Sequence, residues 1–259
     1  MWFLALFCGL VGLMIGSFLN VVIWRVPRDE SVVRPRSHCP ACGHAVRPRD
    51  DIPVVSWLLL RGRCRDCGQP ISVRYPLVEL GTALLFAVTA WHIGLSWALP
   101  AYLYFVAIGV ALAMIDLDVH RLPDPIVLPS YGVVAVLLVV ASLGEDRWDA
   151  LLRAAIGGVA LYLAYFALKF IQPKGMGWGD VKLAGVLGML LGWLGWGQLV
   201  VGGFLGFLLG GVVGGALMAV GKATRKSKIP YGPFMIVGAY LAVLFGAPIT
   251  DLYLDLFVH

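Results

Sequence analysis

The sequence predicts an all-α integral membrane protein with about eight transmembrane helices and a small polar insertion between the first two. Hydrophobic residues make up 60% of the chain and charged residues 14%, whereas soluble domains carry about 25% charged residues. Apolar stretches of about 20 residues, the length that spans a bilayer, recur along the chain. They cover residues 2–24, 77–93, 98–115, 125–143, 150–171, 181–197, 199–220 and 232–250.

The first apolar stretch is expected to be a retained helix and not a cleaved signal peptide. It lacks the basic segment with which signal peptides begin, and its first positive charge, Arg25, follows the apolar run. We therefore expect residues 1–24 to form the first transmembrane helix, with the N-terminus outside.

The sixth apolar stretch admits a second interpretation. Three glycines crowd its end, at positions 192, 195 and 197. Seven transmembrane helices are therefore the alternative, with a re-entrant piece within residues 181–220.

The distribution of basic residues supports the predicted orientation. With the N-terminus outside, every Lys and Arg except Arg147 and Arg153 falls in an inside segment or on an adjoining helix end, as the positive-inside rule requires. Orientation and anionic membrane lipid therefore account for the net charge of +5, and no nucleic-acid partner is needed. The same topology places Asp116 and Asp180 together on the cytoplasmic side.

The insertion, residues 25–76, carries two pairs of cysteines. Cys39 and Cys42 form one C-x2-C motif, Cys64 and Cys67 form the other, and a glycine follows each pair. About 50 residues rarely bury enough core to fold unaided, and four thiolates at this spacing are typical of a tetrahedral structural zinc site. The sequence therefore predicts a small cytoplasmic zinc-knuckle insertion.

Two alternatives to a four-cysteine zinc site remain open. Disulfides would pair the same cysteines, although cytoplasmic proteins rarely keep disulfides. His38 or His44, which flank the first pair, would replace a cysteine ligand, although four cysteines already complete a zinc shell.

Two aspartates lie where apolar stretches end or begin. Asp116 directly follows the apolar run 103–115, and Asp180 directly precedes the sixth stretch. A carboxylate at the edge of the hydrocarbon layer is costly, so such residues are rare and usually functional. Two of them on one side of the membrane suggest a pair that shares a proton, as in aspartyl proteases.

Other roles are open for these carboxylates and their neighbours. Asp124 precedes Pro125, so it is expected to cap the helix that follows. Asp118 is expected to point away from Asp116 into solvent. Asp180, taken alone, would also serve as a helix cap that neutralises Lys182.

Two other protein classes compete with a protease. An ion-coupled membrane transporter also uses carboxylates in the membrane, but it favours positions near the midplane on broken helices. Here both carboxylates lie at helix ends on one side. A zinc-knuckle anchor that only recruits partners would leave Asp116 and Asp180 without a role.

The motifs around the two aspartates resemble those of a known family. Gly177-x-Gly179-Asp180, preceded by Asp116 and by Leu122-Pro123-Asp124, is similar to the GxGD-type aspartyl proteases. The N-terminal part narrows the resemblance to the bifunctional type IV prepilin peptidases of bacteria. The segments that carry it are Gly16–Val21, Arg25–Pro27, the double C-x2-C loop, Asp51–Pro53, Gly62–Cys64 and Ile71–Glu79.

The resemblance implies two activities. The chain would be an aspartic endopeptidase that cleaves the leader peptide of type IV prepilins or pseudopilins at the cytoplasmic membrane face. It would also methylate the new N-terminal residue, with S-adenosylmethionine as methyl donor. The resemblance implies Asp116 and Asp180 as the catalytic pair, and it implies Gly62 and Glu79 in the methyl transfer.

The resemblance and the apolar pattern together imply a location and a domain plan. The expected location is the bacterial inner membrane, with a multi-pass chain whose active site faces the cytoplasm. In this plan, residues 1–24 form the first transmembrane helix, residues 25–76 the Cys-rich loop and residues 77–259 the membrane-embedded aspartyl protease domain.

Overall fold

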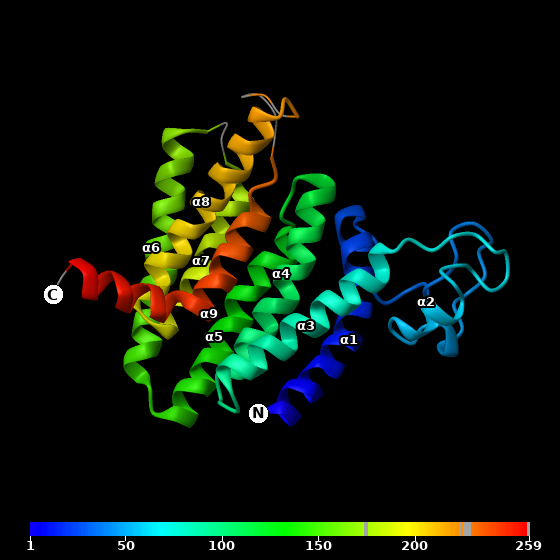
Figure 1. The fold of residues 1–259 in the computed structure, drawn as a ribbon, viewed down its shortest axis with the longest axis horizontal. Coiled ribbons are helices and arrows are strands. Elements are labelled where there is room, and N and C mark those ends of the chain that lie inside the picture. The colour runs from blue at the N-terminus through cyan, green and yellow to red at the C-terminus, as the bar shows by residue number, and fades with distance from the viewer. Residues whose placement is uncertain (174–175, 223, 225–228, 258–259) are drawn as a thin grey trace. The chain divides into compact units, whose positions relative to one another are not determined.

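The computed structural model describes residues 1–173, 176–222, 224 and 229–257 (Figure 1). All eight predicted stretches form helices, and strand pairing in the described residues is limited to two isolated bridges. The prediction of an all-α membrane protein is therefore confirmed. The long helices are α1 (Trp2–Arg25), α3 (Arg74–Ile93), α4 (Leu99–Val119), α5 (Asp124–Glu145), α6 (Trp148–Ile171), α7 (Trp178–Leu194), α8 (Trp196–Ala219) and α9 (Gly232–Phe257).

Seven of these helices are long and apolar enough to cross a membrane, and α7 is the exception. It has 17 residues, so at about 1.5 Å per residue it is roughly 25 Å long. The hydrocarbon core is about 30 Å thick. The two interpretations, seven or eight transmembrane helices, therefore differ only in α7. This is one continuous helix that is shorter than the bilayer core.

The described chain separates into two compact units. The first comprises residues 1–95 with 105–111, and the second comprises residues 96–104 with 112–259. In the first unit, α1 packs against α3 through glycines. A Cβ at Gly12 would lie 2.8 Å from Ala83 Cα, and a Cβ at Gly16 would lie 2.7 Å from Glu79 Cα. The two backbones therefore approach as closely as small residues allow, which is a common way to pair membrane helices.

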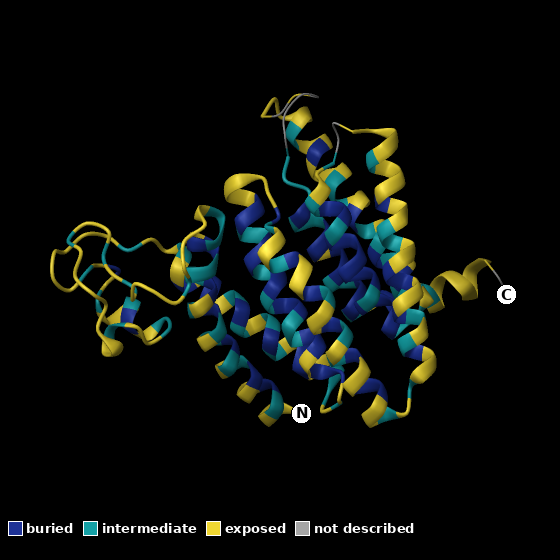
Figure 2. Ribbon diagram, turned by 180° about the vertical axis from the view of Figure 1, so that it is seen from behind, coloured by how far each residue is buried: buried dark blue, intermediate teal, exposed yellow. Residues whose placement is uncertain are grey.

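The insertion between α1 and α3 contains the short helix α2 (Val55–Leu59) and two 3-10 turns, Val26–Arg28 and Pro48–Asp50. Much of its surface is exposed, as the yellow loops of Figure 2 show. A segment with so little buried surface needs another source of stability, as its length also indicates.

In the second unit, α7 is the central helix. Of its 17 residues, 12 are buried, and it packs against α5, α6, α8 and α9. Its contact with α6 is tightest at glycine, because a Cβ at Gly188 would lie 2.3 Å from the Gly157 carbonyl oxygen. Neighbouring helices therefore shield α7 from lipid, which explains how a short helix with a carboxylate at its end is tolerated.

The C-terminal end of α7 explains the two arginines that depart from the positive-inside pattern. Arg153 donates from Nε to the Gly192 carbonyl (2.8 Å) and from Nη2 to the Trp193 carbonyl (3.1 Å). Arg147 lies over the Trp193 ring, 4.3 Å from its centroid. The last carbonyls of a helix lack partners within the helix and attract cations, so Arg153 caps α7.

Replacing Arg153 by Ala is expected to lower the free energy of unfolding by about 1–3 kcal/mol, because two buried carbonyls lose a charged donor. Thermal unfolding of the purified protein in detergent measures this loss. Asp149→Asn is the matched control. Asp149 pairs with Arg153 at 3.4 Å but is 74% exposed, so its loss should change stability little. Equal losses in both variants would show that the ion pair, and not the cap, matters.

Candidate active site

Asp116 lies in the last turn of α4. Its side chain is buried, and its Oδ2 accepts a hydrogen bond from the Gly232 backbone N–H at 2.9 Å. Gly232 is the first residue of α9, where the backbone N–H groups have no partner within the helix. The N-terminus of α9 therefore supplies the donor that a buried carboxylate needs.

Asp180 lies in the first turn of α7, and its side chain is also buried. Its Oδ2 accepts a hydrogen bond from the Gly177 backbone N–H at 2.8 Å. The expected capping contact is therefore present. The second part of that expectation is wrong, because Lys182 pairs with Asp124 and leaves Asp180 without an ion-pair partner among the described residues.

Leu122 packs against both segments that hold the aspartates. A Cβ at Gly179 would lie 2.7 Å from Leu122 Cβ, and a Cβ at Gly232 would lie 3.1 Å from Leu122 Cδ2. Gly179 precedes Asp180, and Gly232 binds Asp116. The two segments that hold the carboxylates therefore pack on the same leucine.

The neighbouring carboxylates are in different surroundings. Asp118 is exposed, as predicted. Asp124 is the first residue of α5, not its cap, and Pro123 occupies the cap position without a side-chain hydrogen bond. Both Asp124 carboxylate oxygens lie 2.8 Å from Lys182 Nζ. The predicted cap is therefore wrong in detail, because Asp124 is held by a lysine of α7.

A second lysine holds the turn before Asp180. Lys169, near the end of α6, donates from Nζ to the carbonyls of Pro173 and Met176. Lys169 thus binds the carbonyl just before Gly177, and the Gly177 N–H donates to Asp180. The position of Asp180 thus depends on a lysine that the sequence analysis did not single out.

The four cysteines of the insertion converge, as their spacing predicts. Their sulfurs lie within 4.8 Å of one another, and all four thiols are free, so no disulfide forms. In a tetrahedral site with zinc–sulfur distances near 2.3 Å, sulfurs are about 3.8 Å apart. The Cys39 and Cys67 sulfurs are 3.7 Å apart, so the cluster fits a zinc ion.

The two cysteine pairs form matching turns. Cys39 N–H donates to the His44 carbonyl and Gly43 N–H to the Cys39 carbonyl; Cys64, Gly68 and Gln69 repeat this pattern. Backbone N–H groups of Cys42 and Ala41 point at the Cys39 sulfur and lower the pKa of this thiol to about 6. This thiol is therefore readily available as the thiolate that binds metal.

Gly62 and Glu79 both shape the insertion. Gly62 has φ +65°, and a Cβ there would lie 2.8 Å from the Trp57 ring, so no other residue fits easily. Glu79 is buried on α3, and its Oε2 accepts a hydrogen bond from Val54 N–H at 2.7 Å. Val54 has φ +62°, which is strained for a β-branched residue. Glu79 thus holds a strained turn in place.

The contact of Gly232 with Asp116 is what the sequence did not predict. Gly232 lies 116 positions from Asp116, and no local spacing links the two. The signal that points to this segment is its composition, Pro230-Tyr231-Gly232-Pro233, since two prolines around a glycine fix a rigid helix start.

Two models of known protein families match the chain. Residues 10–93 match the bacterial peptidase A24 N-terminal domain, and residues 103–219 match the type IV leader peptidase family. No solved structure is significantly similar to the chain.

Several curated relatives are named prepilin leader peptidase/N-methyltransferase. The relative from Stutzerimonas stutzeri is 40% identical over 96% of this chain and 93% of that protein. The relative from Aeromonas hydrophila is 40% identical over 96% and 93%. The relative from Myxococcus xanthus is 47% identical over 73% of this chain and 56% of that protein. With both family models matched and relatives similar over nearly its full length, the chain belongs to the type IV leader peptidase family.

Proposed function

We propose that this protein cleaves the leader peptide of type IV prepilins or pseudopilins and then methylates the new N-terminal residue. The observation that supports the proposal is that two buried aspartates, Asp116 and Asp180, lie at the ends of α4 and α7, held by segments that both pack on Leu122, in a chain of this family. The relatives reported above are named as peptidases and methyltransferases, and none is named as a transporter.

In the proposed cleavage, Asp116 and Asp180 share one proton. The ionised aspartate takes a proton from water, whose oxygen attacks the scissile carbonyl carbon, and the protonated aspartate donates to the carbonyl oxygen. The tetrahedral intermediate then collapses: its hydroxyl returns the proton to the second aspartate, the C–N bond breaks, and the first aspartate gives the proton taken from water to the leaving amine. Two carboxylates within a few Å cannot both ionise cheaply. The hydrogen bonds from Gly177 and Gly232 occupy one oxygen of each carboxylate, which leaves the other oxygen of each for water and substrate.

In this proposal, the second glycine of the Gly177-x-Gly179-Asp180 motif is required for packing. Gly179 has no side chain because Leu122 occupies that space. This close packing fixes the start of α7 and therefore the direction of the Asp180 side chain.

The proposed location is the bacterial inner membrane, with the N-terminus outside and the active site on the cytoplasmic side. The seven candidate spans support a multi-pass protein, and the excess of Lys and Arg around the aspartates favours this orientation. Membrane lipid would then surround the helices, and the substrate's apolar helix would approach through that lipid. No nucleic acid takes part in the proposed function.

For the second activity, we propose that the Cys-rich loop supports methyl transfer. Cys39, Cys42, Cys64 and Cys67 would hold a structural Zn²⁺, which would fix the loop's shape. Gly62 and Glu79 would act through the backbone turns that they hold. S-adenosylmethionine would supply the methyl group, as an N-methyltransferase of this family requires.

Asp116→Asn and Asp180→Asn are each expected to abolish cleavage, because an amide can neither take nor give the shared proton. The loss should be at least 10³-fold in kcat, as when a central catalytic group is removed. Incubation of the purified protein with a tagged prepilin in detergent, followed by mass spectrometry, measures loss of the leader.

Asp118→Asn is the matched control for this experiment, because Asp118 is exposed and two residues from Asp116. This variant should cleave at nearly the wild-type rate. Retained cleavage in Asp116→Asn, with loss in Asp118→Asn or Asp124→Asn, would move the catalytic role to one of these neighbours.

Gly179→Ala should lower kcat at least 10-fold, because the new methyl group would collide with Leu122 Cβ at 2.7 Å and displace Asp180. Leu122→Ala in the same chain should not restore activity, since alanine keeps the Cβ that collides. Gly132→Ala serves as the control because nothing lies within 4 Å of its Cβ position. A rate near wild type for Gly179→Ala would remove this explanation of the motif.

Purified protein is expected to carry about one Zn²⁺ per chain, as a four-cysteine shell binds one ion. Cys39→Ser and Cys64→Ser should lose most of it, whereas Cys8→Ser in α1 should retain it. Lowering the pH should release the metal, because protons compete for the thiolates. Metal analysis by mass spectrometry checks all three results, and a cysteine variant with full zinc content would contradict the site.

A further inference from the structure

Two tyrosines bring their hydroxyls together in the second unit. Tyr165 of α6 and Tyr231, which precedes α9, have hydroxyl oxygens 3.5 Å apart. Tyr165 is 3% exposed, whereas Tyr231 is partly exposed. Of the two hydroxyl-bearing side chains, Tyr231 is therefore the one nearer to solvent.

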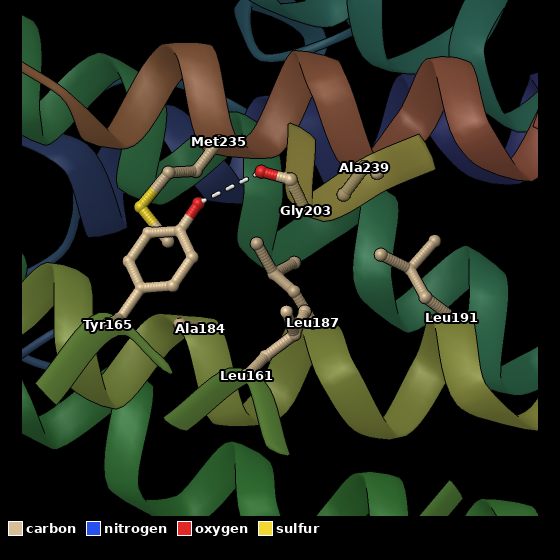
Figure 3. A pocket seen from close by; sticks show the side chains of 9 residues that line it. Leu161, Tyr165, Ala184, Leu187, Leu191, Gly203, Met235 and Ala239 are labelled. Atoms are coloured by element: carbon tan, nitrogen blue, oxygen red, sulfur yellow. Dashed lines mark hydrogen bonds between the residues drawn. The ribbon is translucent and has the colours of Figure 1, made fainter. Parts of the chain in front are cut away.

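The pair lies beside the aspartates. Tyr231 directly precedes Gly232, whose N–H binds Asp116. Tyr165 lines a small cavity with Ala184, one helical turn after Asp180 on the same face of α7 (Figure 3). The dipeptide Tyr231-Gly232 thus holds Asp116 through its backbone, while the Tyr231 hydroxyl meets that of Tyr165, which lines the cavity with Ala184.

Among the described residues, the Tyr231 hydroxyl makes no short hydrogen bond. Good O–H···O bonds are about 2.7–2.8 Å long, and its contact with Tyr165 is 3.5 Å. Tyr165 reaches the Gly203 carbonyl, also at 3.5 Å, as the dashed line in Figure 3 shows. A hydroxyl in apolar surroundings is costly without a partner, so a better acceptor would be bound favourably.

Residues of α8 pack against the rings of Tyr165 and Tyr231. Phe207 of α8 contacts both rings, with centroid distances of 5.0 Å to Tyr165 and 5.6 Å to Tyr231. Gly210 of α8 leaves room for Tyr231, because a Cβ there would lie 3.1 Å from its ring. The cavity beside Tyr165 has a volume of about 10 Å³, room for no more than one water, so a substrate would have to bind on the Tyr231 side.

We propose that Tyr231 is a third catalytic group of the protease site, whose hydroxyl donates a hydrogen bond to the scissile carbonyl oxygen as that oxygen gains negative charge. Tyr165 is the positioning residue that orients this hydroxyl. The hydrogen bond from the Tyr231 hydroxyl to the carbonyl oxygen becomes stronger in the transition state, and the phenol keeps its proton. This inference rests on the proposed cleavage by Asp116 and Asp180.

Tyr231→Phe tests the proposal, because it removes the hydroxyl and keeps the ring against Phe207. With a tagged prepilin in detergent, kcat should fall on the order of 10²-fold, as when one donor to a developing oxyanion is lost. KM should stay within about 3-fold, because a donor that acts in the transition state contributes little to ground-state binding. Tyr165→Phe should lower kcat less than Tyr231→Phe does.

A non-cleavable peptide with a hydroxyl in place of the scissile carbonyl gives a second readout. Tyr231→Phe should weaken its binding by a factor similar to the loss in kcat, while the thermal midpoint stays unchanged. Tyr162→Phe on α6 is the control and should match wild type in every measurement.

Two outcomes would overturn the proposal. The first is a kcat for Tyr231→Phe within about 3-fold of wild type. The second is a loss of kcat that comes with a similar fold-change in KM and a lowered thermal midpoint. Failure of the proposed cleavage itself would be distinguishable, because wild type would then leave the leader intact or Asp116→Asn would still remove it.

Discussion

The central constraint on this structure is the cost of a carboxylate inside an apolar helical bundle. Asp116 and Asp180 are both buried, and burial without a donor would cost several kcal/mol. Each receives one backbone N–H, from Gly232 and Gly177, and both donors lie at the start of a helix. The contact of the α9 start with the end of α4, and the turn before α7, supply these two donors.

That constraint also explains why the helix that carries Asp180 is central. Buried on most of its length, α7 keeps its polar end away from lipid because α5, α6, α8 and α9 surround it. Glycines make this enclosure possible, since Gly157 and Gly188 let α6 and α7 touch backbone to backbone. Arg153 closes the opposite end. A short, enclosed helix therefore needs its polar ends satisfied by protein, whereas the spanning helices are not required to be enclosed.

Features with a local signal in the sequence were predictable, and features that join distant segments were not. The eight helices follow from apolar runs, and the cysteine cluster follows from two C-x2-C pairs. By contrast, Gly232 binds Asp116 across 116 positions, and Lys182 pairs with Asp124 across 58. No period or spacing encodes such contacts, because they arise from how finished helices pack. The predicted domain boundaries at residues 24 and 76 stay predictions.

The insertion and the second unit are stabilised by different physical means. The insertion exposes most of its side chains, and its cysteine pairs are joined by ion pairs, Arg47 with Asp66 and Arg65 with Asp50. Arg47 and Asp66 are partly exposed, so this pair contributes little, whereas the Asp50 side chain is only 8% exposed. With so few buried side chains in the insertion, bound metal would still stabilise much of it. The aspartates instead depend on close helix packing in the second unit. A chelator should therefore disturb the insertion while the packing around Asp116 and Asp180 persists.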